Sequence, residues 1–87
     1  MDYQEFKQLP RNEQFAAAGK IAGIPPEVFD GIWSTESGRG QHMLSQAGAE
    51  GHFQLMPQTR KSLEAKLGVA IDPYDFSSSL FAAASLM

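Results

Sequence analysis

The 87-residue chain contains no cysteine, so it cannot form disulfides, bind zinc through thiolates or use a thiol nucleophile. It also lacks an apolar run of the roughly 18 residues that a membrane-spanning helix requires. Its 7 basic residues are scattered along the chain, and the formal net charge is -3. No basic stripe is therefore available to follow a phosphate backbone. These absences predict a protein with no membrane span and no nucleic-acid partner.

What the chain does contain is typical of a folded domain. Hydrophobic residues make up 43% and charged residues 20%, and the length suits one small domain or part of one. The N-terminal residues lack the basic start and the apolar stretch of a secretory signal. We therefore expect one mostly folded unit without a signal peptide.

Periodicity and helix-ending residues predict a mainly α fold, with several short helices around a loop or small hairpin. Glycine follows three of the predicted helices and proline begins two of them, as is common at helix ends. Residues 39 to 53 show no sustained periodicity and are expected to form the loop or hairpin. The helices are expected over residues 3 to 9, 11 to 22, 26 to 37 and 57 to 67, with a last helix that begins between residues 75 and 79.

Glu36 is the candidate catalytic residue. It lies four residues after Ile32 and eight after Val28, so on an intact helix it continues an apolar stripe. We expect its carboxyl group to be at least half buried, which disfavours the charged form, and the negative end of the helix dipole acts in the same direction. Periodicity alone favours a simpler alternative, in which Glu36 is exposed at a fraying helix end.

The residues that follow Glu36 resemble a known family. The sequence reads Glu36-Ser37-Gly38, then Ser45-x-x-Gly48-Ala49-x-Gly51, then Gln54-Leu55-Met56-Pro57-x-Thr59. This order resembles the soluble lytic transglycosylases, which have a lysozyme-like α+β fold and cleave peptidoglycan. The resemblance covers residues 24 to 87. We therefore expect a helical lead-in over residues 1 to 23, and over residues 24 to 87 the N-terminal part of a catalytic domain, truncated at its C-terminal side.

The resemblance implies a role for four side chains. Glu36 would be the general acid and base, and Ser45, Gln54 and Met56 would line the glycan cleft. A hydroxyl and an amide can hydrogen-bond sugar groups, and a thioether can form an apolar wall. Taken without the resemblance, the same three residues are more simply a turn serine, a structural loop amide and a core methionine.

The chain departs from the family pattern in two places. The family's Gly-Leu-Met-Gln is here Gly51-His52-Phe53-Gln54, which changes the side chains beside the site. The family's later Ala-Tyr-Asn motif, whose tyrosine helps to orient the glutamate, has no counterpart. We also expect Leu80, Ala83, Ala84 and Met87 to form an apolar helix face that nothing in these 87 residues covers.

The reaction implied by the resemblance needs one carboxyl group and no metal or cofactor. Glu36 would cleave the β-1,4 bond between N-acetylmuramic acid (MurNAc) and N-acetylglucosamine (GlcNAc) in peptidoglycan strands, with formation of a 1,6-anhydro ring. Glu50 is the one acidic residue in the cleft loop, so a hydrolytic muramidase that uses Glu36, Glu50 and water is an alternative. His42 and His52 are too weakly patterned to predict a metal site.

A third alternative is a non-catalytic structural or glycan-docking protein. A cell-wall substrate combined with the missing signal peptide suggests a bacteriophage virion protein, carried in the particle and acting in the host periplasm during entry. Other virion proteins, or further residues of a longer chain, would then be its partners. An enzyme delivered by a secretion system or released by lysis would fit the same observations.

Overall fold

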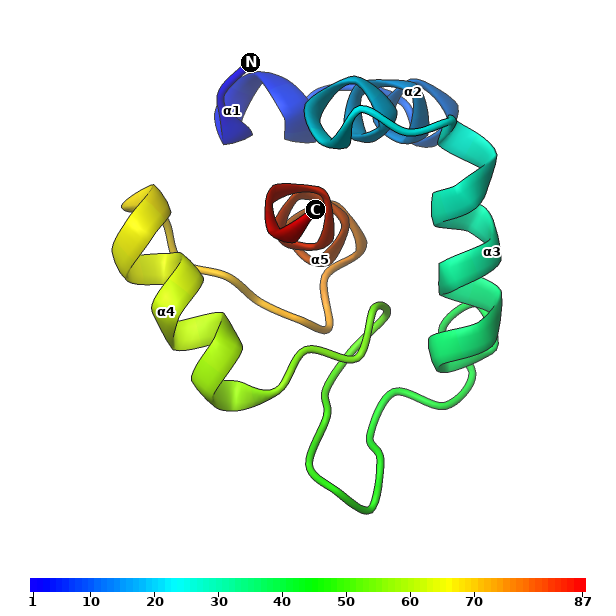
Figure 1. The fold of residues 1–87 in the computed structure, drawn as a ribbon, viewed down its shortest axis with the longest axis vertical. Coiled ribbons are helices and arrows are strands. Elements are labelled where there is room, and N and C mark those ends of the chain that lie inside the picture. The colour runs from blue at the N-terminus through cyan, green and yellow to red at the C-terminus, as the bar shows by residue number, and fades with distance from the viewer.

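The computed structural model covers residues 1–87 and contains five helices. They are α1 (Tyr3–Lys7), α2 (Arg11–Ala22), α3 (Pro26–Ser37), α4 (Pro57–Leu67) and α5 (Phe76–Leu86). Figure 1 shows α5 in the centre, with α1 and α2 along one side, and α3 and α4 on either flank. The mainly α prediction is confirmed. No helix is long and apolar enough to span a bilayer.

Local residues explain where these helices begin and end. Asp2 and Glu5 form the capping box at the start of α1, in which each side chain bonds the backbone of the other residue. α2, α3 and α4 end at the predicted glycines, which adopt left-handed conformations that cost a side-chain-bearing residue energy. The predicted bounds of these three helices are confirmed, whereas α1 ends two residues earlier than expected.

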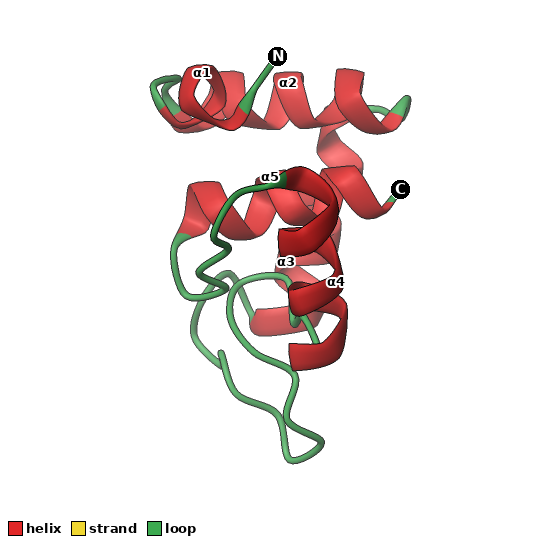
Figure 2. Ribbon diagram, turned by 90° about the vertical axis from the view of Figure 1, so that its left-hand side faces the viewer, coloured by secondary structure: helices red, strands yellow, loops and turns green.

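Residues 38 to 56 form an irregular loop with no extended strand (Figure 2). Its ladder-like contacts are two isolated bridges, from Leu44 to Glu50 and from Glu50 to Leu55. Gly48 and Gly51 have positive φ angles of 91° and 83°, which glycine adopts without steric cost and which let the backbone turn tightly. The predicted segment is therefore a loop, and it connects the end of α3 to the start of α4.

α5 is buried on most of its surface, and its covered residues include both apolar side chains and serines. Leu80 and Ala84 are almost completely covered, and the aromatic ring of Phe81 packs against Tyr3 and Phe6 of α1. Met87 is 61% exposed. The expected uncovered face is thus wrong for Leu80 and Ala84, because α5 lies at the centre and packs against α1 and α2.

Three consecutive serines at the start of α5 each bind a different segment. The Ser77 hydroxyl accepts a hydrogen bond from the Gln14 side chain of α2 at 2.7 Å. Ser78 accepts from the Asp72 backbone at 2.9 Å, and Ser79 accepts from the Phe53 backbone at 3.2 Å. Buried polar groups are stable only when paired. These hydroxyls therefore attach the central helix to α2, to the Asp72-Pro73 turn and to the loop.

The buried side chains form two separate clusters. The larger cluster joins α1, α2, α3 and α5, and the smaller one joins α4 and the segments that flank it to α5. The smaller cluster consists of Leu55, Leu63, Ile71 and Ala82. The loop contributes Phe53 to the larger cluster and Leu55 to the smaller one, so the segment that carries part of the candidate site is anchored to both.

The buried side chain of Gln14 in α2 joins α1, the segment after α1 and α5. Its side-chain nitrogen lies 3.3 Å from the Phe6 carbonyl, 3.1 Å from the Leu9 carbonyl and 2.7 Å from Ser77. Gln14→Leu should lower the free energy of unfolding by about 1–3 kcal/mol, because buried acceptors lose their donor. Urea denaturation measures this. Gln4→Leu, at an exposed position, is the control and should stay within about 0.5 kcal/mol.

Candidate active site

Glu36 lies in the last turn of α3, immediately before the final residue of that helix. Its side chain is exposed, and it takes part in neither of the two ion pairs of the structure. The prediction that it is at least half buried is wrong. The carboxyl group is instead directly accessible from solvent, as in the alternative that periodicity favoured.

The reason is a rotation of α3 about its axis by one residue relative to the predicted stripe. The buried row is Phe29, Trp33 and Ser37. The predicted row of Val28, Ile32 and Glu36 lies beside it, with Val28 39% exposed and Ile32 half buried. The two rows have the same four-residue spacing. Glu36 therefore lies at the edge of the packed face of α3.

Hydrogen bonds fix the turn that carries Glu36. The buried Ser37 hydroxyl donates to the Trp33 carbonyl at 3.3 Å and accepts from the Gly40 backbone at 3.0 Å. Arg39 has a positive φ of 55°, which is unfavourable for a residue with a side chain. Its guanidinium makes two hydrogen bonds to Asp30, at 3.0 and 3.3 Å, and this lowers the pKa of Asp30. The end of α3 is thus held at a defined position.

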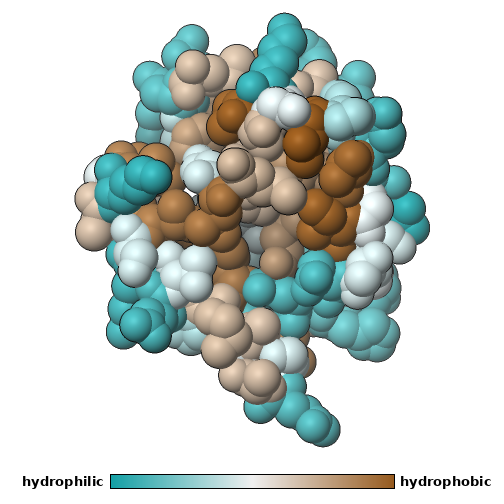
Figure 3. Space-filling view, viewed as in Figure 1, coloured by the Kyte–Doolittle hydropathy of each residue, from teal (hydrophilic) through white to brown (hydrophobic).

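Gln54 and Met56 come together at a groove beside this helix. A cavity of about 330 Å³ is lined by both residues and by Phe29 and Ile32 of α3. Ala83, Leu86 and Met87 of the α5 end also line it. Figure 3 shows apolar side chains gathered on the face where α3, α4 and the end of α5 meet. The helix row that lines this groove through Ile32 reaches Glu36 one turn later, about 6 Å along the axis.

Each of these two residues has a structural role as well. Gln54 has a positive φ of 53°, and its side-chain nitrogen donates to the Gly51 carbonyl at 2.8 Å. Its carbonyl oxygen makes no hydrogen bond within the chain, so it can accept one from a ligand. Met56 is 43% exposed at the start of α4, which excludes the core-methionine interpretation.

Ser45 does not line this groove. Its hydroxyl accepts from the Ala49 backbone at 2.9 Å, and its own backbone nitrogen donates to the Ala49 carbonyl at 3.0 Å. These bonds close the turn over residues 45 to 49, as the turn-serine interpretation requires. The hydroxyl proton stays available to a ligand. A contact of Ser45 with substrate stays a prediction.

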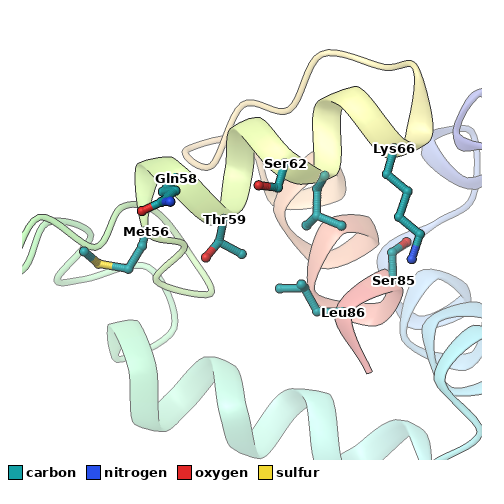
Figure 4. A pocket seen from close by; sticks show the side chains of 8 residues that line it. Met56, Gln58, Thr59, Ser62, Lys66, Ser85 and Leu86 are labelled. Carbon is teal, nitrogen blue, oxygen red and sulfur yellow. The ribbon is translucent and has the colours of Figure 1, made fainter.

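A larger groove of about 630 Å³ lies between α4 and α5 (Figure 4). Gln58, Thr59, Ser62 and Lys66 of α4 face it, and Ser85 and Leu86 of α5 form the opposite wall. It shares Met56, Thr59 and Leu86 with the smaller groove. Glu36 lines neither groove, but the smaller groove reaches α3 through Phe29 and Ile32, whereas the larger one contains no residue of α3.

Glu50 is the acidic residue of the loop, and the fold engages its carboxylate. The Tyr74 hydroxyl donates to Glu50 Oε2 at 3.2 Å, and the Glu50 backbone exchanges two hydrogen bonds of 2.9 Å with Leu55. Partial burial, with the nearby Glu50 charge, raises the pKa of Tyr74. Glu50 therefore connects the loop to the turn before α5.

Sequence reasoning did not predict a cluster of aromatic and basic side chains around Trp33, three residues before Glu36. The indole nitrogen of Trp33 donates to His52 Nδ1 at 3.1 Å, and the guanidinium of Arg11 lies 4.1 Å from the Phe76 ring centroid. His52, which replaces the leucine of the family motif, was a signal for the first contact. No pattern pointed to Arg11. No group of three or more His, Asp or Glu side chains comes together in a metal-binding arrangement.

Comparison with known protein families identifies the family of this chain. The family model described as the transglycosylase SLT domain matches residues 13–87, which is most of the chain. The chain belongs to this family. No curated protein and no solved structure matched the chain. As an SLT domain, it has a function of the peptidoglycan-acting, lytic transglycosylase type.

The SLT match includes every candidate residue and begins within α2. The resemblance stated from the motifs is therefore confirmed. The roles of Glu36, Ser45, Gln54 and Met56, and the boundary at residue 24, stay predictions. The carboxyl group of Glu36 is exposed, and the groove lined by Gln54 and Met56 reaches Ile32, one helical turn before it.

Proposed function

We propose that the chain is a peptidoglycan lytic transglycosylase that cleaves the MurNAc-GlcNAc β-1,4 bond, with Glu36 as its single acid and base. One observation carries this proposal within the SLT family. The accessible carboxyl group of Glu36 lies one helical turn beyond Ile32, which lines the same groove as Gln54 and Met56. A glycan strand in that groove passes beside Glu36.

The reaction proceeds in two proton transfers. Glu36 first protonates the glycosidic oxygen as the bond to MurNAc breaks, and the N-acetyl oxygen of MurNAc stabilises the developing positive charge. The Glu36 carboxylate then takes the proton of the MurNAc C6 hydroxyl. The C6 oxygen closes the 1,6-anhydro ring, so no water is consumed.

The hydrogen bond from Tyr74 to Glu50 supports a reaction with one carboxyl group. A hydrolytic mechanism requires a second carboxylate, either to attack the sugar or to activate water. In the structure, Glu50 accepts the Tyr74 proton and its backbone is paired with Leu55. These contacts give Glu50 a role in the loop that does not depend on catalysis.

Product analysis tests this proposal. Digestion of purified glycan strands should yield 1,6-anhydromuramoyl ends, each one water molecule lighter than a reducing end, as mass spectrometry can show. Glu50→Gln should remain active, because its amide oxygen still accepts the Tyr74 hydrogen bond. Reducing muramoyl ends together with an inactive Glu50→Gln variant would establish a muramidase instead. Delivery of the protein by a virion stays a prediction from the sequence.

A further inference from the structure

His52 occupies a confined position between α3 and the start of α5. Its Nδ1 accepts the hydrogen bond from Trp33 at 3.1 Å, and its ring meets the Phe76 ring edge-on, with 5.6 Å between centroids. Its backbone nitrogen donates to the Pro73 carbonyl at 3.0 Å. A Cβ added to Gly40 would lie 3.0 Å from the His52 ring. The imidazole is thus surrounded by helix, turn and loop.

This position connects the two segments of the proposed site. Trp33 lies three residues before Glu36, and its carbonyl accepts from the Ser37 hydroxyl in the same turn. His52 lies two residues before Gln54, in the loop that reaches the groove. The bond between the Trp33 and His52 side chains is therefore a direct link between the Glu36 helix and the Gln54 loop.

We propose that neutral His52 is a positioning residue, which holds the Gln54 loop against the helix that carries Glu36, and that protonation of His52 breaks this link. The inference rests on the proposed function for its effect on catalysis. The link itself is a property of the fold. At this place the family motif has leucine, which can neither accept a hydrogen bond nor titrate.

The chemistry of the two rings explains why the link depends on protonation. An indole N–H can only donate, and the imidazole nitrogen that accepts from it must carry no proton. The neutral ring therefore carries its proton on Nε2. In the imidazolium both nitrogens are donors. A protonated His52 would thus oppose two N–H groups across the same contact.

The surroundings of His52 favour its neutral form. Burial is the largest cause that lowers the pKa of His52 from its ordinary value of 6.5, and the positive charge of Arg11 from α2 acts in the same direction. Asp75, which caps α5, and a backbone hydrogen bond at Tyr74 oppose them. The pKa is lower in the folded chain than in the unfolded chain. The link is therefore intact above about pH 6.5, and its contribution to stability is lost as the pH falls through the folded value.

Two substitutions separate the hydrogen bond from the titration. In His52→Asn, the side-chain oxygen takes the place of Nδ1 and can accept from Trp33, but it does not titrate. In His52→Leu, the acceptor is lost and the buried Trp33 donor is left unpaired. His42→Gln is the matched control, because His42 is an exposed histidine of the same loop.

NMR tests the link without any assay of activity, because Trp33 is the single tryptophan and gives one indole N–H signal. Between about pH 5 and 8 that signal should titrate with a midpoint below 6.5 in the wild type and in His42→Gln. It should not titrate in His52→Asn. A wild-type signal that does not move, or a titration that persists in His52→Asn, would overturn the proposal.

Kinetics then test the positioning role. His52→Leu should lower kcat by between about tenfold and a hundredfold, the effect of a misplaced site, with a smaller change in KM. His52→Asn should restore most of kcat and should keep it at acidic pH, where the wild type loses it through His52. Equal kcat and equal pH profiles in all three proteins would reject positioning. If the wild type itself does not cleave peptidoglycan, the proposed function fails, while the NMR titration still decides the link.

Discussion

Replacing Glu36 with Gln should lower the rate of peptidoglycan cleavage by at least about a hundredfold, which is a typical contribution of a general acid. Gln has the shape of Glu but neither donates the proton to the leaving oxygen nor accepts one from the C6 hydroxyl. The loss should appear in kcat, since the groove lined by Gln54 and Met56 is unchanged. Release of soluble fragments from purified cell walls measures it.

The fold should survive this substitution. Glu36 is exposed and belongs to neither ion pair, so the free energy of unfolding should change by no more than about 0.5 kcal/mol. Glu27→Gln removes an exposed carboxylate from the first turn of the same helix and serves as the matched control. It should leave cleavage intact. Full turnover by Glu36→Gln would reject Glu36 as the acid.

Gly51→Ala should be the most damaging small substitution in the loop. An added Cβ would overlap the Pro73 carbonyl oxygen, and the φ of 83° is unfavourable for alanine. Overpacking costs about 1–3 kcal/mol and a left-handed alanine about 1–2 kcal/mol. The Pro73 carbonyl cannot simply move away, because it also accepts from the His52 backbone. Denaturant unfolding should show a loss of roughly 2–5 kcal/mol.

Gly68→Ala separates these two costs. Gly68 also has a positive φ, of 69°, but a Cβ there would meet nothing within 4 Å. This variant should therefore lose only about 1–2 kcal/mol, the cost of the backbone conformation. If the two variants are equally stable, the close packing of Gly51 on Pro73 contributes nothing to the fold.

The ends of the helices could be predicted from the sequence because their causes are local. Gly23, Gly38 and Gly68 end three helices by adopting left-handed conformations, whatever the rest of the chain does. The orientation of α3 about its axis could not be predicted this way. The rows through Ile32 and through Trp33 have the same spacing, and the choice depends on which row buries the larger aromatic area.

The candidate site likewise combines features that follow from local sequence with features that depend on the tertiary fold. The motif located Gln54 and Met56, and the structure brings both to one groove. The exposure of Glu36 follows from the orientation of α3, and it agrees with the alternative that periodicity favoured and not with the predicted burial. The contact between Trp33 and His52 joins residues 19 positions apart and depends on how the loop folds back. Such contacts depend on the tertiary fold, and spacing along the chain does not contain them.

The division of the core into two clusters has a consequence for local unfolding. α4 contributes a single fully buried side chain, Leu63, whereas α5 contributes seven buried residues. A helix held by so little buried surface can detach at a small fraction of the free energy needed to unfold the whole domain. α4 also forms one wall of the larger groove, and its Thr59 lines the smaller one. We therefore expect this wall to open locally while α5 and the turn that carries Glu36 stay folded.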